Sequence, residues 1–346
     1  MTGMMKTALM TGIGKIEFEQ RPIPQAQAGD VLIQIEYIGV CGSDLHYYEA
    51  GRIGDFIVSP PFVLGHEVGG TVVALGDGVT GLAIGDRVAL EPNVTCGECA
   101  FCNSGKYNLC PDVRFFATPP IDGVFQEYVV HPAPLCFKLP DNVSTMEGAL
   151  IEPLAVGFHA ANTGGAKAGQ KALVFGAGCI GLVSILALRA KGVETVYAVD
   201  MLDSRLAVAE TIGATAAIHF DKQDVIQTAS AVAPGGFDLI IETSGSEVAA
   251  RQAIELAKKG SVIVLVGYSP SGDMTLPMGK AMDKELSLKT IFRYRHVYPE
   301  AIQAVSNGEI QLKDIVTKIF TFDELPSAMK LCAENKADIV KAVVRV

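Results

Sequence analysis

Residues 172–200 show the clearest alternation of apolar and polar positions in the chain. Residues 172–175 are a short apolar run, which is typical of a strand buried on both faces and too short for a helix. The glycine-rich segment GAGCIG, residues 176–181, ends this run, and apolar residues then continue to about residue 190 in a pattern that predicts a helix. A second β-branched run covers residues 195–199, and Asp200 follows it. The pattern predicts a strand, a tight turn, a helix and a second strand that ends at an acid.

The same alternation of strands and helices continues to about residue 292. We expect helices over residues 204–212 and 248–259, the second one ended by Gly260. Counted with the two strands above, the predicted strands number six; the further four cover residues 216–220, 237–242, 261–268 and 286–292. Six strands alternating with helices predict an α/β fold, a parallel doubly wound sheet with the strand order 3-2-1-4-5-6.

The first half of the chain has a different pattern, with short apolar runs and few helices. Strands are expected over residues 31–40, 67–75 and 87–90, and Gly-Asp turns separate the later ones. Beyond residue 294 we expect a helix over 299–306, short strands and a terminal strand, KAVVRV. A final strand this apolar must pair with something, and we expect it to return to the antiparallel strands of the first half. The α/β unit is then an insertion, and we expect the active site to lie in the cleft between this unit and the antiparallel strands.

Composition narrows the class of protein. The net charge is −10 without a block of like charges, which argues against a nucleic-acid partner or an anionic membrane surface. Residues 172–188 are almost unbroken apolar, but their three glycines and marginal length argue against a membrane span. The N-terminus is a poor secretory signal, and half of the eight cysteines have metal-ligand spacing. We therefore expect a cytoplasmic protein with reduced cysteines.

Four cysteines lie within 15 residues, at positions 96, 99, 102 and 110. Four thiolates at this spacing can surround one tetrahedral Zn²⁺ and hold a loop that has little core of its own. An iron–sulfur cluster is the alternative, and Pro111 after the last cysteine favours it. The bacterial cluster motif has three residues before that cysteine instead of seven, and the chain has no second cysteine set. Structural zinc is the preferred interpretation.

The glycine turn has the features of a dinucleotide-binding site. Gly176 permits the tight turn, Gly178 lets backbone N–H groups approach a pyrophosphate, and Gly181 lets the helix pack closely on the strand. Asp200, 19 residues beyond Gly181, can accept hydrogen bonds from the adenosine ribose and would repel a 2′-phosphate. Arg205 could pair with such a phosphate, although a helix-surface position is the preferred interpretation. These residues predict NAD as the cofactor.

A second group of possible metal ligands is scattered along the first half. Cys41 follows a predicted strand, His66 and Glu67 follow a Pro-Pro turn, and Glu152 lies in the segment IEPL. Sulfur, nitrogen and oxygen ligands of this kind form open catalytic zinc sites, which leave one position for water or substrate. A single cysteine is usually a core residue and a single histidine is usually structural. Spacing alone leaves both interpretations open.

Taken together, these motifs resemble the zinc-dependent medium-chain alcohol dehydrogenases over essentially the whole chain. The resemblance lies in GVCGSDLH (39–46), PFVLGHEVGGTV (61–72), CGECAFCNSGKYNLC (96–110), ALIEPLAVGFHA (149–160) and GAGCIG (176–181). Within that family the sequence is most similar to the polyol branch, the sorbitol and xylitol dehydrogenases. The branch is suggested by HYYEAGRIGDFIV (46–58), FFATPPIDG (115–123), KLPDNVS (138–144) and FRYR (292–295).

This resemblance implies a fold and a set of site residues. The implied fold is a GroES-like twisted β-barrel catalytic domain, residues 1–154 and 295–346, with an inserted Rossmann domain, residues 155–294, and a structural zinc lobe at about 91–113. Cys41, His66 and Glu67 match the catalytic zinc ligands, Glu152 reaches that metal directly or through water, and Asp44 supports a ligating histidine. Ser43 and His46 match a proton relay. The remaining implied residues bind cofactor (Gly176, Gly178, Cys179, Ile180, Gly181, Asp200 and Arg205) or substrate (Tyr47, Phe115, Arg293 and Tyr294).

The resemblance also implies an activity. We expect reversible NAD-linked oxidation of a sugar alcohol, xylitol or sorbitol, to the 2-ketose, with two zinc ions per chain and a homotetramer or dimer. A related zinc secondary-alcohol dehydrogenase, such as one for L-arabinitol or butanediol, is the first alternative. A zinc-free oxidoreductase would not need the cysteine lobe, and a non-catalytic NAD-binding protein would not need Ser43, His46, Glu152 and Arg293 as a set.

Overall fold

The structure is a computed structural model that describes residues 3–269, 272–335 and 337–346. The chain divides into two compact units, and each is described by itself. Unit 1 comprises Met1–Glu152, Tyr298–Ser306 and Val316–Val346, and unit 2 comprises Pro153–Val297 and Asn307–Ile315. The predicted boundaries assign residues 307–315 to the catalytic domain, whereas in the structure this segment has its contacts within unit 2.

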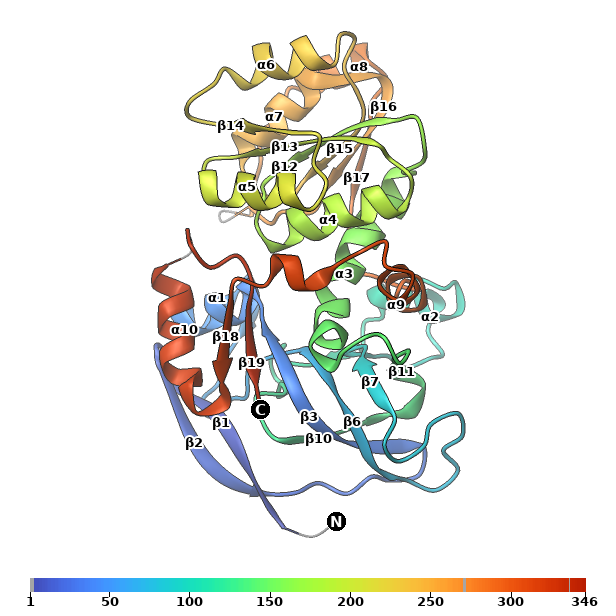
Figure 1. Ribbon diagram of the computed structural model, residues 1–346, viewed down its shortest axis with the longest axis vertical. Helices are drawn as coiled ribbons and strands as arrows, with labels where there is room; N and C mark the ends of the chain where they lie inside the picture. The colour runs from blue at the N-terminus through green and yellow to red at the C-terminus, as the bar shows by residue number, and fades with distance from the viewer. Residues whose placement is uncertain (1–2, 270–271, 336) are drawn as a thin grey trace. The chain divides into compact units, whose positions relative to one another are not determined.

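Unit 2 is built on one parallel sheet (Figure 1). Its strand order is β14-β13-β12-β15-β16-β17, which is the predicted order 3-2-1-4-5-6. The strands are β12 (Lys171–Phe175), β13 (Thr195–Asp200), β14 (Ala216–His219), β15 (Phe237–Glu242), β16 (Ala257–Leu265) and β17 (Ser287–Thr290). The central strands are buried on both faces, which explains their nearly continuous apolar sequence. The predicted doubly wound sheet is confirmed.

Helices cover both faces of this sheet. Figure 1 shows α4 and α5 on one face and α6, α7 and α8 on the other. Their bounds are α4 (Cys179–Ala190), α5 (Asp203–Thr211), α6 (Val225–Val232), α7 (Glu247–Leu256) and α8 (Met278–Asp283), and η3 (Leu312–Ile315) is a short 3₁₀ turn. The prediction that α7 extends to residue 259 is wrong. The helix ends at Leu256 because Ala257 already pairs with Phe237 of β15 as the first residue of β16.

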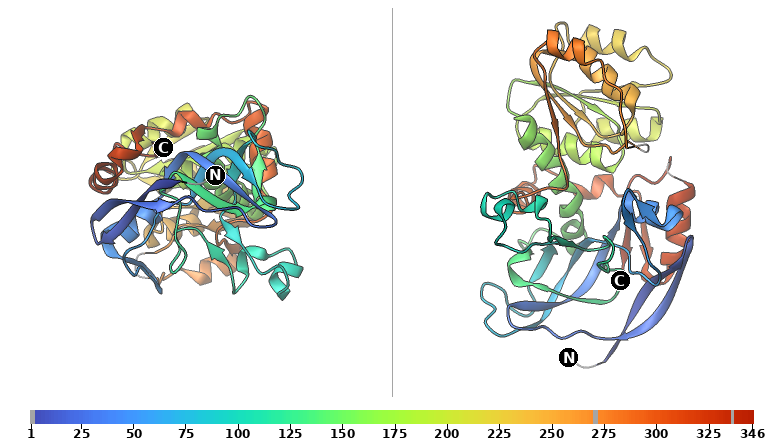
Figure 2. Two further views of the ribbon diagram at one scale, coloured as in Figure 1. Left: turned by 90° about the horizontal axis from the view of Figure 1, so that it is seen from below. Right: turned by 180° about the vertical axis from the view of Figure 1, so that it is seen from behind.

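Unit 1 is organised around β3 (Asp30–Val40), which pairs with three strands. The main sheet has the order β11-β7-β6-β3-β19-β18, and β10 also pairs with β3. Its strands are β6 (Glu67–Leu75), β7 (Arg87–Leu90), β10 (Tyr128–Pro132), β11 (Cys136–Lys138), β18 (Lys318–Thr321) and β19 (Ala342–Arg345). The strands β1 (Met4–Gly12) and β2 (Lys15–Pro22) form a separate hairpin, which Figure 2 shows in dark blue. Two short pairs complete the unit: β4 (Arg52–Ile53) with β5 (Phe56–Ile57), and β8 (Asn93–Val94) with β9 (Arg114–Phe115).

The last strand returns to the first half of the chain, as predicted. β19 runs antiparallel to β3, with Ala342 opposite Val40 and Arg345 opposite Tyr37. Val343 and Val344 of β19 are completely buried, so the apolar terminus fills part of the core of unit 1. The return of the terminus makes unit 2 an insertion in the sequence of unit 1.

The pattern analysis did not predict three of the longer helices. They are α1 (Gly42–Ala50), α3 (Thr145–Gly164) and α10 (Leu325–Glu334); the helical elements of unit 1 also include α2 (Ala100–Asn103), α9 (Tyr298–Ser306) and the short turns η1 (Tyr107–Leu109), η2 (Ala133–Leu135) and η4 (Phe322–Glu324). Pro153 lies inside α3, where the sequence alone indicates a helix break. Among the described residues, no helix has both the length and the apolar character needed to cross a membrane.

Candidate active site

The end of β3 is where the predicted catalytic ligands meet. Glu67, the first residue of β6, lies opposite Gly39 of β3, and Cys41 follows β3 directly. His66 precedes Glu67 in the chain and therefore reaches the same end of the strand. On the other side of β3, Ala342 pairs with Val40, which brings Lys341 to this end of the sheet. The strand register alone gathers residues that lie up to 300 positions apart in the sequence.

Asp44 holds the two ligand segments together. Its side chain is completely buried; Oδ2 accepts a hydrogen bond from the backbone N–H of Cys41 at 3.0 Å, and Oδ1 accepts one from Gly65 at 2.8 Å. Nδ1 of His66 lies 3.7 Å from the same carboxylate. Asp44 is the third residue of α1, where a carboxylate also compensates the unpaired N–H groups of the helix start. One acid therefore fixes the positions of Cys41 and His66.

The donor set at this point fits a metal ion. Cys41, His66 and Glu67 each offer one ligand atom, and these atoms lie within 4.8 Å of one another. Glu67 is completely buried, and Nζ of Lys341 lies 2.5 Å from its carboxylate, within ion-pair distance of both oxygens. A Cβ on Gly39 would come within 1.7 Å of Oε2 of Glu67, so a side chain at residue 39 would displace the carboxylate. A buried carboxylate beside a thiol and an imidazole, with one ligand atom from each within 4.8 Å of the others, is consistent with three-ligand zinc binding.

Charge at this site acts on His66. Burial would lower the pKa of its imidazole, but the interactions with Asp44 and Cys41 outweigh burial and place that pKa well above its ordinary value. Without a metal ion the site therefore favours a proton on His66. A bound metal would replace this proton as the compensating positive charge.

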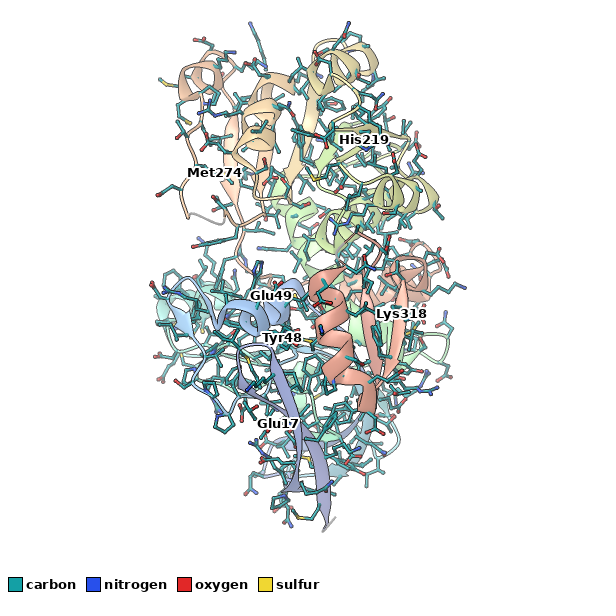
Figure 3. The ribbon with its side chains drawn as sticks, turned by 90° about the vertical axis from the view of Figure 1, so that its left-hand side faces the viewer. Glu17, Tyr48, Glu49, His219, Met274 and Lys318 are labelled. Carbon is teal, nitrogen blue, oxygen red and sulfur yellow. The ribbon has the colours of Figure 1, made fainter. Side chains whose placement is uncertain are left out.

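The other predicted catalytic residues lie on two helices. Glu152 is a buried residue of α3, but it does not belong to the group of three ligand atoms found among the described residues. Ser43 is half-buried in the first turn of α1, and His46 is exposed one turn later on the same helix. Residues three apart on a helix are neighbours, so Ser43 and His46 share one face of α1. Figure 3 labels Tyr48 and Glu49, which lie on α1 shortly after His46.

The predicted substrate residues fall in both units. In unit 1, Tyr47 is buried on α1, and the ring of Phe115 lies 5.6 Å from that of His66, centroid to centroid. In unit 2, Tyr294 is buried, and the guanidinium carbon of Arg293 lies 4.8 Å from the ring centroid of Phe292. Arg293 has a positive φ of 54°, which is unusual for a residue with a side chain. The structure therefore places Phe115 beside the ligand group within unit 1.

The four-cysteine lobe is a closed cluster. The Sγ atoms of Cys96 and Cys110 lie 3.5 Å apart, those of Cys99 and Cys102 lie 3.5 Å apart, and all four lie within 4.8 Å of one another. Tetrahedral zinc with Zn–S bonds of about 2.3 Å requires Sγ–Sγ distances of about 3.8 Å. The cysteines are free thiols, without disulfides. Their arrangement fits one structural zinc ion.

The thiols of this lobe differ in acidity. Backbone N–H groups of Glu98 and Cys99 lower the pKa of Cys96 to about 7. Burial raises the pKa of Cys110 to about 11. Cys99 is the N-cap residue of α2, and its sulfur accepts a hydrogen bond from the backbone N–H of Cys102. Backbone donors that point at sulfur are the usual support of thiolate ligands.

The glycine turn of unit 2 has the close contacts that a dinucleotide site requires. The turn follows β12 in the chain, at the point of the sheet where β12 and β15 are neighbours and the strand order reverses. A Cβ on Gly181 would lie 1.8 Å from the carbonyl oxygen of Gly176, so only glycine lets α4 begin so near the strand. Thr243, which follows β15, donates a hydrogen bond to the carbonyl oxygen of Phe175 at 2.8 Å. Gly178 precedes α4, and Cys179 and Ile180 are its first two residues.

Asp200 and Arg205 both lie against this turn. Oδ2 of Asp200 accepts a hydrogen bond from the backbone N–H of Ala177 at 2.7 Å, and Oδ1 accepts one from Leu202 at 3.0 Å. Nη1 of Arg205 lies 4.0 Å from Oδ2 of Asp200 and 3.7 Å from the position of a Cβ on Gly178. Arg205 is a partly exposed residue of α5 whose guanidinium reaches the glycine turn, and its role in cofactor binding stays a prediction.

The sequence analysis missed Lys341, Gly39 and Asn93, all close to the ligand group. Lys341 has a completely buried ammonium group that lies 2.5 Å from Glu67. A charged residue at the start of the apolar segment KAVVRV was the available signal. Gly39 has no signal beyond being a glycine in a strand, which indicates a close approach. Asn93 lies between Glu91 and Cys96, the first cysteine of the lobe, and its burial cannot be seen in the sequence.

Two family models match the sequence. The model described as "Alcohol dehydrogenase GroES-like domain" matches residues 27–141, and the one described as "Zinc-binding dehydrogenase" matches residues 179–307. Together they cover most of unit 1 before α3 and most of unit 2.

Curated relatives match nearly the whole chain. An uncharacterized zinc-type alcohol dehydrogenase-like protein of Escherichia coli is 42% identical and covers 98% of each chain. The sorbitol dehydrogenase of Bacillus subtilis is 38% identical and covers 98% of this chain and 97% of its own length. A probable D-xylulose reductase of Aspergillus clavatus is 40% identical over 93% of this chain and 92% of its own length.

Solved structures give the same result. A protein of Sinorhizobium meliloti described as a "putative zinc-binding dehydrogenase" and bound to NADP has a TM-score of 0.91 at 31% identity, and the match covers 99% of this chain and 100% of that one. An alcohol dehydrogenase of E. coli complexed with NADH has a TM-score of 0.91 at 30% identity, with 99% of both chains covered. The 2R,3R-butanediol dehydrogenase of B. subtilis has a TM-score of 0.91 at 34% identity, again with 99% of both covered. With its two matched family models and its long curated relatives, the chain belongs to the zinc-dependent medium-chain alcohol and polyol dehydrogenase family.

Proposed function

We propose that this enzyme catalyses the reversible NAD-linked oxidation of a sugar alcohol, xylitol or sorbitol, to the corresponding 2-ketose. The observation that carries the proposal is the group of Cys41, His66 and Glu67, with the ring of Phe115 beside His66. The sorbitol dehydrogenase and D-xylulose reductase relatives, at 38% and 40% identity, support the polyol class.

The residues of the site would hold the zinc ion and would provide a route for the proton that the reaction releases. Bound zinc would act as a Lewis acid that lowers the pKa of the substrate hydroxyl, and bound NAD would accept the hydride from the carbinol carbon. Oxidation also releases the hydroxyl proton. Ser43 Oγ can accept this proton and pass its own to His46, whose exposed ring can deliver a proton to water. Asp44 keeps Cys41 and His66 in place throughout.

We also propose two zinc ions per chain. The donor set of Cys41, His66 and Glu67 would hold an exchangeable ion, with Glu152 binding it directly or through water. The four-cysteine lobe would hold a closed one, because its sulfur–sulfur distances suit a tetrahedral ion. We therefore expect only the exchangeable ion at Cys41, His66 and Glu67 to affect turnover directly.

NAD is proposed as the cofactor because of Asp200. Its carboxylate is nine-tenths buried and held by two backbone N–H groups at the end of β13, so its charge is fixed where the ribose is expected. Arg205, next to it, offers a cation that could favour a 2′-phosphate, and the family includes both NADH and NADP complexes. The carboxylate lies closer to the turn than the guanidinium does, and this favours NAD.

For substrate binding we propose Tyr47, Phe115, Arg293 and Tyr294. A guanidinium with five donors suits a ligand that carries many hydroxyl groups. The main alternative substrate is a short diol, since a butanediol dehydrogenase is 34% identical to this chain. The homotetramer stays a prediction from the resemblance, and the cytoplasmic location stays a prediction from the N-terminal sequence and the cysteine spacing.

A kinetic panel tests the proposal. Initial rates of NADH formation would be measured with xylitol, sorbitol, L-arabinitol, 2,3-butanediol and 2-butanol, each with NAD and with NADP. We expect the highest kcat/KM for a five- or six-carbon polyol with NAD. A higher kcat/KM for 2,3-butanediol than for every polyol would contradict the polyol assignment and favour the alternative.

A further inference from the structure

Asn93 is a completely buried amide that has no hydrogen bond at either end. It is 1% exposed, and neither Oδ1 nor Nδ2 has a partner among the residues that the structure describes. Thr7 and Ser261 each have one buried hydroxyl oxygen without a hydrogen bond, whereas Asn93 has both a donor group and an acceptor without one. Buried polar groups without partners are rare and require an explanation, such as a bound molecule.

The position of Asn93 shows which site it belongs to. Asn93 of β8 lies directly opposite Phe115 of β9 in an antiparallel pair. Residues directly opposite in such a pair project from the same face and lie side by side. The ring of Phe115 in turn lies 5.6 Å from the ring of His66. Phe115 is therefore the strand partner of Asn93 and the ring neighbour of His66, and all three residues belong to unit 1.

The chemistry of an amide suggests its ligand. Asn offers a carbonyl oxygen that accepts and an NH₂ group that donates, next to each other on one carbon. Two hydroxyl groups on neighbouring carbons have the same arrangement, because each can donate and accept. A monohydroxylated alcohol has its only hydroxyl at the reacting centre and can offer nothing to a second polar group.

We propose that Asn93 binds hydroxyl groups of the substrate other than the one that is oxidised, and so selects diols and polyols over simple alcohols. This inference rests on the proposed function and deepens it. It also gives the buried amide of Asn93 its missing partners, because its hydrogen bonds form only when a polyhydroxylated substrate is present.

The test compares Asn93→Leu, which keeps the approximate volume and removes both polar groups, with Asn108→Leu. Asn108 is buried to the same extent in the same lobe and already has a partner. For Asn93→Leu we expect kcat/KM for xylitol and sorbitol to fall on the order of 30-fold or more, while kcat/KM for 2-butanol stays within about threefold of wild type. KM for NAD should not change.

Thermal unfolding without substrate is the second readout. Removing an unpaired buried amide should leave the melting temperature of Asn93→Leu unchanged or raise it, whereas Asn108→Leu should lower it because a bonded amide is lost. Equal loss of kcat/KM for polyols and for 2-butanol would overturn the inference. So would unchanged selectivity, which is the result expected if the amide binds only a buried water molecule.

The failure of the inference and the failure of the proposed function can be told apart. If wild type oxidises 2,3-butanediol but no polyol, the proposed substrate class is wrong, and Asn93 is then judged by the ratio of kcat/KM for 2,3-butanediol to that for 2-butanol. We expect Asn93→Leu to lower this ratio as well. A wild-type enzyme that oxidises only monohydroxylated alcohols would overturn both.

Discussion

The ammonium group of Lys341 lies 2.5 Å from Oε1 of Glu67, and the two side chains are 1% and 0% exposed. Nζ of Lys341 also donates to the carbonyl oxygen of Val40 at 3.1 Å. The carboxylate expected to bind zinc therefore has a buried cation directly against it, which compensates its charge inside unit 1 when no metal is present. This pair connects the last strand of the chain to the ligand group at the end of β3.

Lys341→Met should destabilise the zinc-free protein more than the zinc-bound one. Without the ammonium group the buried charge of Glu67 has no counter-charge, which typically costs about 3–5 kcal/mol, and bound zinc would supply that charge instead. Urea unfolding with and without zinc measures the difference. In the double variant Lys341→Met with Glu67→Gln most of the lost stability should return. An equal loss with and without zinc would show that Lys341 acts only through packing.

Asp200→Ser should weaken NAD binding and raise the use of NADP, because it removes a fixed negative charge from the expected ribose site. We expect the ratio of kcat/KM for NADP to that for NAD to rise by about tenfold or more, which corresponds to about 1.4 kcal/mol. Asp200→Asn is the matched control, since it keeps an acceptor for the N–H of Ala177 without the charge. A wild-type enzyme that already prefers NADP would show that the assignment is wrong.

His131 should make the stability of the protein depend on pH. Its ring is completely buried, Nε2 lies 2.8 Å from the carbonyl oxygen of Glu91, and burial lowers the pKa of the imidazole to about 4. The unfolded chain has a histidine pKa of about 6.5, so it takes up a proton first as the pH falls. Stability is therefore complete above pH 6.5 and is lost between about pH 6.5 and 4, by on the order of 3 kcal/mol.

The measurement is the free energy of unfolding in urea at several pH values for wild type, His131→Gln and His46→Gln. The slope between pH 6.5 and 4 should decrease in His131→Gln and stay as in wild type in His46→Gln, because His46 is exposed. An unchanged slope in His131→Gln would assign the acid sensitivity to other groups.

Cys99→Ser should lower stability and zinc content without a direct effect on chemistry. The loss of one of four thiolates opens the lobe, which has few apolar contacts of its own, so we expect about one equivalent of zinc to be lost together with a lower melting temperature. Cys136→Ser is the control, since Cys136 is a buried core thiol outside both ligand groups. Retention of the full zinc content in Cys99→Ser would contradict a structural ion there.

The sequence predicted the sheet of unit 2 because buried parallel strands and a glycine turn leave short-range signals. Residues 176–181 and Asp200 identify the turn without knowledge of the rest of the fold. The end of α7 was missed because Lys258 and Lys259 continue a helical pattern, and only the pairing of Ala257 with β15 ends it. Long-range pairing thus overrides local preference at that boundary.

The candidate active site was predictable only in its ligand types. Cys41, His66 and Glu67 could be named from short motifs, but the register of β3 with β6 and β19 decides that Gly39 and Lys341 lie next to Glu67. Neither pairing leaves a local signal. The unpartnered state of Asn93 is likewise a property of packing, since the residue type alone favours an exposed turn.

The central claim is that a metal ion held by Cys41, His66 and Glu67 is required for oxidation of a polyol. The most direct measurement is the rate of NADH formation from xylitol and sorbitol as zinc is titrated into chelator-treated wild type and His66→Ala, with zinc content and circular dichroism recorded in parallel. In wild type, activity should return with a second equivalent of zinc. His66→Ala should stay folded, keep about one equivalent and show no turnover. Turnover by folded His66→Ala, or full activity in zinc-free wild type, would contradict the account.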